Sequence, residues 1–459
     1  MEEKKQTNPI ALKDISLKEL VERAIISEYQ LNAVIVANYI LIRCIIHCID
    51  NKLYDVNGEI TDTDIDSVLA RFFRYYPHST DRLFKRVKIE IKNRVERVTY
   101  EPPINEINLL NGTLYTDGTF SDEKKICINR LNVNYNPNAS TPVNFFKYLK
   151  DLFVPEDIPT IQEYLGYLLI PTTKAQKALF IIGLGGEGKG RLNILLTDIF
   201  KSNMKNGCFH KLEDNRFATS TLKDKLLMID DDLQFNALKS TGTVKSLITA
   251  ETPFDVEEKG VQLHQVKLYC RYLCLGNDFP KALYDKSNGF LRRLIVITTK
   301  NRSNNIIDPY IAEKMIAEKE AIFLWMFNGL QRLIANNFTF TISDRTKRNI
   351  DLLTEELCNI QEFLKDKNYV EFGSDNSCAS KELYSSYEEW CDLNALSPFK
   401  LKPFIHWLKD NAERLDIQYS SHIVYGKSTD VRGFKGLKVM HVSKYYITRT
   451  HTDDEEQNV

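Results

Sequence analysis

A short run of the chain, ALFIIGLGGEGKGRLNILLTDIF (residues 178–200), constrains the fold more than any other feature. Five apolar residues precede a glycine-rich loop, and the residues after the loop have the apolar spacing of an amphipathic helix. In the pattern GxxxxGK, backbone N–H groups turn toward phosphate oxygens and the lysine adds a positive charge. The sequence therefore predicts a strand, a phosphate-binding loop and a helix. The loop residues expected at the nucleotide are Gly183, Gly185, Gly186, Gly188, Lys189 and Gly190.

Gly190 departs from the usual form of this pattern, which has a serine or threonine there. That hydroxyl normally binds Mg²⁺. Two interpretations stay open. The fold is degenerate and does not hydrolyse nucleotide, or a water takes the vacant coordination position, because Mg²⁺ usually keeps several waters.

A second motif, KLLMIDDDL, places acidic residues after four apolar ones. A buried strand that delivers carboxylates at its end suits a magnesium–ATP site. We expect Asp230 to hold the water shell of the metal and Asp231 to polarise the attacking water, and Asp232 could share either role. The alternative is a solvated acidic loop.

Two further segments supply polar groups. The predicted strand LYCRYLCLG leads to Asn277, which either donates a hydrogen bond toward the γ-phosphate or is a turn residue. Arg292 and Arg293 precede the apolar strand LIVITT. A guanidinium stabilises charge on a transferring phosphoryl group and often comes from a neighbouring subunit. These arginines therefore indicate a ring, unless they form a salt-bridged surface pair.

The charge of the whole chain is nearly balanced, with 61 Lys and Arg against 62 Asp and Glu. A surface for a polyanion therefore requires local segregation of charge. Residues 81–97 hold seven basic and three acidic side chains, which indicates either a solvated helix face or a phosphate-contacting surface. Residues 399–444 hold nine basic against four acidic side chains.

The cysteines and apolar runs suggest a cytoplasmic protein. Nine cysteines form no CxxC pair and no zinc spacing, so reduced thiols are expected. The N-terminus has no secretory signal pattern. The longest apolar run, residues 33–49, is interrupted by Asn38, Arg43 and His47 and predicts a buried helix, with His47 packed on it, and no membrane span.

The C-terminal part has the order helix, helix and hairpin. Ser380 is expected to cap a helix through Asp392, and Ser397-Pro398 to begin a second helix through about Leu415. The segments IQYSSHIVYG and GFKGLKVMHV then read as strands joined by KSTDVRG. This is winged-helix order, in which the second helix can enter a major groove, although many winged helices bind protein instead. The DNA-binding candidates here are Lys400, Lys402, Lys427, Arg432 and Lys435.

Taken in order, the loop, LLMIDDD, VKSLITAETPFDVEEKG, LCLGND and GFLRRL resemble the superfamily 3 helicases of viruses, phages and plasmids. The likeness is to the poxvirus-type and satellite-phage primase-helicases in particular, and more specifically to the replication proteins of staphylococcal pathogenicity islands and related cassettes. It covers about residues 101–300 and 360–440 and leaves 1–100 unmatched. Ala250 stands where the family commonly has glycine.

The resemblance implies an α/β, AAA+-like P-loop ATPase core with a helical N-terminal region and a C-terminal winged helix. It makes Lys189 the phosphate lysine, Asp230 and Asp231 the acidic pair, Asn277 the sensor and Arg292 or Arg293 the finger supplied in trans. A hairpin that contacts single-stranded DNA in the ring pore would carry Lys259, with His264 and Lys267 as weaker candidates. ATP and Mg²⁺ are the implied cofactors.

This organisation divides the chain into six segments. They are a helical domain (residues 1–100), a helical and β-turn domain (101–175), the ATPase (176–300), a helical connection (301–365), the winged helix (366–445) and an acidic tail (446–459).

The expected function is that of a replicative DNA helicase and replication initiator of a mobile genetic element. It would form a homo-hexamer, travel 3′ to 5′ on single-stranded DNA, recognise origin duplex through the winged helix and meet host replication proteins. No primase activity is expected, because residues 1–100 are too short for a polymerising domain. The alternatives are an origin-binding or assembly protein that binds nucleotide without hydrolysis, and an ATPase that remodels a protein partner.

Overall fold

The computed structural model describes residues 25–27, 30–73, 81–214, 216–233, 242–257, 262–277, 288–300, 308–357, 359–394, 396, 398–425, 428–441 and 443. The chain divides into two compact units. The first unit takes in Met1–Leu233, Gly242–Asn277 and Arg293–Thr346, and the second takes in Gln234–Thr241, Asp278–Arg292 and Lys347–Val459.

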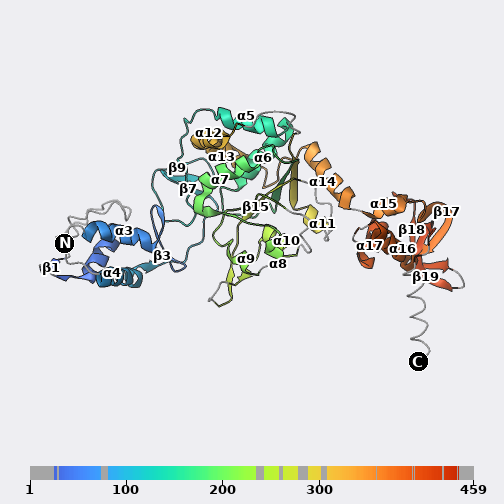
Figure 1. Ribbon diagram of the computed structural model, residues 1–459, viewed down its shortest axis with the longest axis horizontal. Helices are drawn as coiled ribbons and strands as arrows, with labels where there is room; N and C mark the ends of the chain where they lie inside the picture. Colours follow the sequence, from blue (N-terminus) through green and yellow to red (C-terminus); the bar gives the residue numbers. More distant parts are fainter. Residues whose placement is uncertain are drawn as a thin grey trace, which may run out of the picture. The chain divides into compact units, whose positions relative to one another are not determined.

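The centre of the first unit is a five-stranded parallel sheet (Figure 1). Its strands, in spatial order, are β11 (Met204–Asn206), β12 (Leu227–Asp230), β15 (Arg271–Gly276), β10 (Ala178–Ile182) and β16 (Leu294–Thr298). Leu179 of β10 pairs with Leu273 on one side and with Ile295 on the other. Strands covered on both faces read as continuous apolar runs, which is why ALFII and LIVIT were recognisable. The mixed α/β character expected from the sequence is present.

Helices cover this sheet. The principal ones are α5 (Val143–Leu152), α6 (Ile158–Tyr167), α7 (Gly190–Phe200), α12 (Ile311–Ala317) and α13 (Lys319–Ala335), and the shorter ones are α8 (Lys211–Asp214), α9 (Arg216–Ser220) and α10 (Gly242–Thr249). Figure 1 shows α5, α6, α12 and α13 together on one side of the sheet, and α8, α9 and α10 on the other. Helices α6 and α13 approach each other closely at two glycines. A Cβ on Gly166 would lie 2.3 Å from the Met326 carbonyl oxygen, and a Cβ on Gly329 would lie 2.3 Å from the Gln162 carbonyl oxygen.

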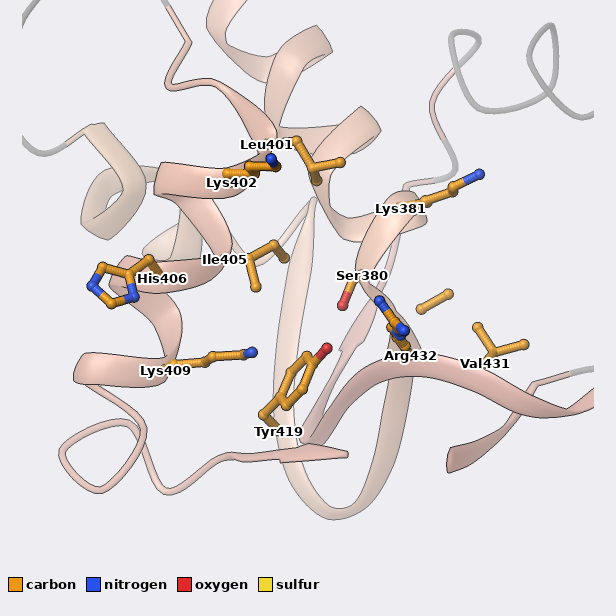
Figure 2. A pocket seen from close by; sticks show the side chains of 11 residues that line it. Ser380, Lys381, Leu401, Lys402, Ile405, His406, Lys409, Tyr419, Val431 and Arg432 are labelled. Atoms are coloured by element: carbon orange, nitrogen blue, oxygen red, sulfur yellow. The ribbon is translucent and has the colours of Figure 1, made fainter. Parts of the chain in front are cut away.

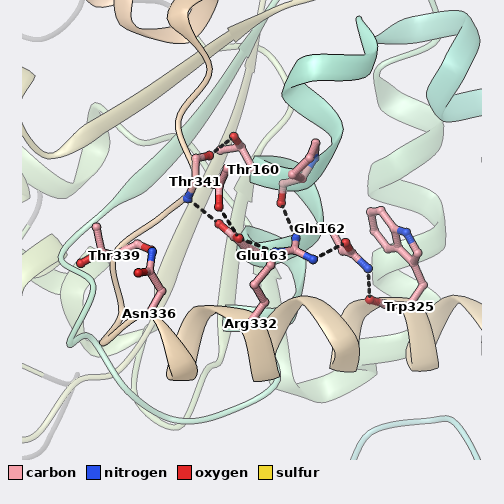
Figure 3. Close-up of polar contacts among 9 residues, drawn as sticks. Thr160, Gln162, Glu163, Trp325, Arg332, Asn336, Thr339 and Thr341 are labelled. Atoms are coloured by element: carbon pink, nitrogen blue, oxygen red, sulfur yellow. Dashed lines mark hydrogen bonds and ion pairs between the residues drawn. The ribbon is translucent and has the colours of Figure 1, made fainter.

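A buried carboxylate fastens the same two helices to the segment that follows α13 (Figure 3). Glu163 on α6 is fully buried. Its carboxylate accepts hydrogen bonds from Arg332 Nε at 2.6 Å, from the Thr341 backbone N–H at 2.7 Å and from the Thr341 hydroxyl at 2.8 Å. A buried carboxylate is tolerated only with such partners. Glu163 therefore holds three segments together.

Residues 105–121 form a small antiparallel sheet of β7 (Glu106–Leu109), β8 (Gly112–Tyr115) and β9 (Phe120–Ser121). The strands are joined at Asn111-Gly112 and Asp117-Gly118. Asn-Gly and Asp-Gly pairs are typical of tight turns between short strands.

The region before residue 100 has a core of its own and contains strands as well as helices. Its elements are β1 (Ile25–Ser27), β2 (Gln30–Leu31), α2 (Ala33–Arg43), β3 (His47–Ile49), β4 (Lys52–Asp55), β5 (Gly58–Ile60), α3 (Asp62–Phe73), α4 (Asp81–Arg94) and β6 (Glu96–Arg97). Strands β5, β4, β3 and β6 form a sheet in that order. The expected helical domain thus has helices α2, α3 and α4 in its described part, together with a sheet that the sequence did not predict.

The single helix predicted over residues 33–49 ends at Arg43, and His47 lies on strand β3 instead. Residues 47–49 form a strand because a tight turn at Asp50 and Asn51 pairs β3 with β4. Both turn residues have left-handed φ angles, 49° and 64°. Apolar spacing does not distinguish the end of a helix from the start of a short buried strand. None of the helices in the described part of the chain has the length and apolar character that a membrane span needs.

The basic helix α4 packs beside α3 and pairs with it. Lys88 Nζ lies 2.8 Å from Asp66 Oδ1, and Lys92 Nζ lies 2.9 Å from Asp62 Oδ1. These ion pairs favour the solvated-face interpretation of residues 81–97 over a phosphate-contacting surface.

The second unit contains a three-stranded antiparallel sheet in the order β17 (Val370–Ala379), β19 (Ser428–Val439) and β18 (Gln418–Tyr425). Helices α15 (Asn359–Lys365), α16 (Ser380–Leu393) and α17 (Leu401–Asp410) complete its core, and α14 (Asp344–Leu357) precedes them. The two predicted helices and the hairpin are present, although α17 is shorter than expected at both ends. Strand β17 was missed, and Ser380 is the first residue of α16 and makes no capping bond.

Candidate functional site

The glycine loop, residues 183–189, leaves the carboxyl end of β10 and enters α7 at Gly190. It lies at the carboxyl edge of the sheet, where β10 is flanked by β15 and β16. Gly185, Gly186 and Gly188 have φ angles of 95°, 77° and 96°, a region that side-chain-bearing residues rarely adopt. The loop conformation therefore requires glycines where the pattern has them.

Gly183 is required for a different reason, which is close packing. A Cβ on this residue would lie 2.2 Å from Thr299 Oγ1 and 2.9 Å from Lys189 Nζ. The absence of a side chain at Gly183 thus leaves room for the Lys189 side chain to lie across the start of the loop.

The donors of the loop converge on one carboxylate. The Leu184 N–H donates to Glu187 Oε1, and the Gly185 N–H donates to Glu187 Oε2 at 3.0 Å. Lys189 Nζ lies 2.9 Å from the same Oε2. Glu187 is 4% exposed and Lys189 is 7% exposed. These three donors form an anion cradle, and Glu187 is the anion that it holds.

Burial opposes the ionisation of Glu187, but the hydrogen bonds from Lys189 and from the loop N–H groups outweigh it. They hold the pKa of this carboxyl below its usual value, so Glu187 is charged at neutral pH. Sequence reasoning missed Glu187, although an acidic residue inside a phosphate-loop pattern was a visible signal.

Asn277 follows β15 directly and contacts Lys189, which ends the glycine loop after the neighbouring strand β10. Lys189 Nζ donates to Asn277 Oδ1 at 3.3 Å. A Cβ on Gly185 would also lie 3.7 Å from this oxygen. The structure thus brings together two residues, Lys189 and Asn277, that the sequence placed in one site. Tyr148, on α5, was not anticipated and donates from its hydroxyl to the Gly188 carbonyl oxygen at 3.1 Å.

Asp230, the last residue of β12, and Asp231, which follows it, have different surroundings. Asp230 is 3% exposed and accepts hydrogen bonds from the Phe209 N–H at 2.6 Å and the Asp232 N–H at 3.2 Å. Burial raises the pKa of Asp230 above its usual value, although these hydrogen bonds act against the shift. Both of its oxygens are engaged by the backbone, which makes Asp230 well placed to fix the turn after β12.

Asp231 is exposed and faces the start of α7. A Cβ on Gly190 would lie 3.6 Å from both carboxylate oxygens of Asp231. The carboxylate therefore stands beside the residue that lacks the usual hydroxyl. Within the described ranges, no cluster of three or more His, Cys, Asp or Glu side chains could hold a metal ion by itself.

The two arginines before β16 differ in exposure. Arg293 is half-buried, and its Nε donates to Thr249 Oγ1 on α10 at 3.0 Å. Arg292 is exposed. Of the two, Arg292 has the accessibility that a residue acting on a neighbouring subunit requires.

The predicted DNA-contacting hairpin is partly described. The sequence predicts its strands over residues 254–258 and 266–273. The structure pairs β13 (Phe254–Val256) antiparallel with β14 (His264–Val266), so the first strand is shorter than predicted and the second lies earlier in the chain. His264 Nδ1 is within 3.2 Å of the Gln262 carbonyl oxygen, and Lys267 is exposed. Lys259 lies outside the described residues.

The second unit has a cavity of about 720 Å³ between α16, α17 and the sheet, which we name the cationic groove (Figure 2). It is lined by Ala379, Ser380, Lys381, Leu401, Lys402, Ile405, His406, Lys409, Tyr419, Val431 and Arg432. None of these lining residues is acidic. Lys409 Nζ lies 3.5 Å from the centre of the Tyr419 ring, which holds the ammonium group over the groove floor.

The groove unites two of the five basic residues that the sequence selected, Lys402 and Arg432. Lys400 and Lys435 are exposed but do not line it, and Lys427 lies outside the described residues. Lys381, His406 and Lys409 were missed, because only the packing of α17 against the sheet brings them to the same cavity.

Comparisons with known proteins give a short family match and distant structural neighbours. A family of unknown function (DUF5906) matches residues 181–293, a range that contains the glycine loop, both aspartates, Asn277 and both arginines. No curated protein matches the chain.

Two solved structures illustrate the structural comparison. "The A form apo structure of NrS-1 C terminal region-CTR" is 14% identical, covers 85% of this chain and 96% of that chain, and has a TM-score of 0.46. "The apo structure of NrS-1 C terminal region (305-718)" is 14% identical, covers 85% and 95%, and has a TM-score of 0.45.

Proposed function

We propose that the first unit binds and hydrolyses ATP with Mg²⁺, and that the chain is a ring-forming DNA helicase that initiates replication of a mobile genetic element. The observation that carries the proposal is the anion cradle at the edge of the parallel sheet. Lys189 and two consecutive loop N–H groups converge there on one negative charge, beside Asn277. Binding sites of open α/β sheets lie at this carboxyl edge.

The residues of the cradle have roles that follow from their positions. The Leu184 and Gly185 N–H groups and the Lys189 ammonium bind phosphate oxygens, because consecutive N–H groups and a buried cation favour an anion. Asn277 positions Lys189 through its side-chain oxygen and presents its amide to the terminal phosphate. Asp230 fixes the turn that presents Asp231 to the start of α7.

Magnesium fits this site only together with the nucleotide. When bound, Mg²⁺ neutralises charge on the phosphate oxygens. Asp231, beside Gly190, is the carboxylate that would hold it, through a water or directly. Mg²⁺ commonly takes one or two protein carboxylates and fills its other positions with phosphate oxygens and waters.

The proposed DNA contact in the second unit rests on the cationic groove and the exposed bases around it. Lys402, Lys409 and Arg432 come from α17 and β19, and no acidic side chain lines the cavity with them. Phosphate oxygens of a duplex are the groups that such a surface favours. We assign origin binding to this winged-helix-like unit, and translocation on one strand to the hairpin β13–β14.

The test is ATP hydrolysis with and without single-stranded DNA, together with unwinding of a forked duplex. Lys189→Ala and Asp230→Ala are expected to abolish both activities. Lys201→Ala is the matched control, because Lys201 is an exposed lysine paired with Asp198 just after α7. Full turnover by Lys189→Ala would remove the enzymatic assignment. Sizing of the complex with ATP tests the ring.

A second candidate is a nucleotide-binding assembly protein that does not hydrolyse ATP. Gly190 favours it, since the usual magnesium hydroxyl is absent. ATP-dependent assembly without any release of phosphate would select this second candidate.

A further inference from the structure

Glu187 occupies the place where a bound anion is expected. Its Oε1 lies so far inside the loop that a Cβ on Gly183 would be 2.8 Å from it. The carboxylate accepts from the Leu184 and Gly185 N–H groups and from Lys189. The cradle therefore contains a negative charge that belongs to the chain itself.

A carboxylate and a phosphate make the same demands on such a cradle. Each presents anionic oxygens to N–H donors, and each gains from a nearby ammonium group. The Leu184 N–H, the Gly185 N–H and the buried Lys189 ammonium cannot serve Glu187 and a phosphate group in the same geometry. One anion must leave before the other binds.

We propose that Glu187 is a built-in competitor for the phosphate position, and that ATP binds by displacing its carboxylate from the loop. This inference rests on the proposed nucleotide site. Leu184, Gly185 and Gly186 are exposed, so the displaced side chain can turn toward solvent. Glu187 thereby sets the nucleotide concentration at which the site fills, because its carboxylate neutralises the cradle when no nucleotide is bound.

The size of the effect follows from the fraction of molecules in which the cradle is open. An apparent dissociation constant equals the intrinsic constant divided by the fraction of competent molecules. If the carboxylate holds the cradle in about ten of eleven molecules, removing its charge strengthens binding about tenfold. Glu187→Gln keeps the size of the side chain and removes that charge.

The experiment is equilibrium titration of the full chain with ATP and, separately, with inorganic pyrophosphate in the absence of Mg²⁺. Wild type, Glu187→Gln, Glu187→Ala and Lys189→Ala are compared, with thermal melting as the check on folding. Both Glu187 variants are expected to bind both ligands about tenfold more tightly than wild type. Unchanged or weaker binding by the Glu187 variants would overturn the proposal, because Glu187 would then be a brace that shapes the loop.

The Lys189→Ala variant separates this proposal from the assignment of the site. If Lys189→Ala loses binding while Glu187→Gln gains none, the competitor alone is wrong. If Lys189→Ala binds ATP as wild type does, the nucleotide site itself is wrong, and the competitor with it. If Glu187→Gln has a lower melting temperature than wild type, Glu187→Ala provides the same comparison without a polar side chain at this position.

Discussion

Two buried glutamates of the first unit make similar ion pairs but have different partners. Glu163 lies 2.6 Å from Arg332 Nε, and Glu187 lies 2.9 Å from Lys189 Nζ. The partners of Glu163 are 169 and 178 residues away in the chain. Those of Glu187 are two or three residues away. One carboxylate joins distant segments, whereas the other closes a single loop on itself.

The difference lies in what remains when the carboxylate is removed. Without Glu163, Arg332 and Thr341 lose an acceptor that ties α6 to α13 and to the segment after it. Without Glu187, water or a phosphate can reach the N–H groups of the exposed Leu184 and Gly185, and the buried Lys189 keeps Asn277 Oδ1 as an acceptor. A buried ion pair therefore does not by itself identify a structural residue, and the origin of its partners is more informative.

The largest expected effect separates the two glutamates by stability. Glu163→Ala should lower the free energy of unfolding by about 3 kcal/mol, because it removes the buried acceptor of three hydrogen bonds that join distant segments. Glu187→Ala should lower it by about 1 kcal/mol or less, since Leu184 and Gly185 lie at the surface and Lys189 keeps its contact with Asn277. Urea unfolding followed by circular dichroism measures both variants. Equal losses would break the comparison and make Glu187 a structural residue.

A second pair of variants sharpens the account of the loop. Gly183→Ala places a methyl group 2.2 Å from Thr299 Oγ1, whereas Gly190→Ala meets its nearest atoms at 3.6 Å. Overpacking costs about 1–3 kcal/mol, so Gly183→Ala should weaken ATP binding about tenfold or more. Gly190→Ala should bind within about twofold of wild type, because no atom must move. ATP titration of both proteins is the measurement, and a stronger loss in Gly190→Ala would contradict the geometry.

The smallest expected effect concerns the cationic groove. Glu187 neutralises the charge of Lys189 in the loop, whereas no acidic residue lines the groove. Duplex affinity should fall steeply with salt, and Lys402→Ala or Arg432→Ala should each reduce the slope of log affinity against log salt by about one. Lys438→Ala is the control, because Lys438 is paired with Glu371 at 2.6 Å. A weak salt dependence in wild type would assign the groove to a protein partner.

Local patterns in the sequence were sufficient to predict the loop. The run before Gly183 forms β10, and the residues from Gly190 form α7, because each signal lies within about twenty residues. The parallel arrangement that brings Asn277 to Lys189 also follows, since successive strand ends meet at one edge.

Features that depend on distant contacts were not predictable. No local pattern links Glu163 with Arg332, or Lys409 with Tyr419, because these pairs form only when α6 packs on α13 and α17 packs on β18. Strand β17 was missed because its central residues, FGSDNS, are largely exposed and lack apolar alternation. Strand β3 was hidden inside an apolar run that continues from a helix.

The structure of the full chain with a non-hydrolysable ATP analogue and Mg²⁺ tests the central claim most directly. The account predicts phosphate oxygens on the Leu184 and Gly185 N–H groups and on Lys189 Nζ, with the Glu187 carboxylate turned out of the loop. An analogue bound elsewhere, with Glu187 still accepting from Leu184, Gly185 and Lys189, would contradict it.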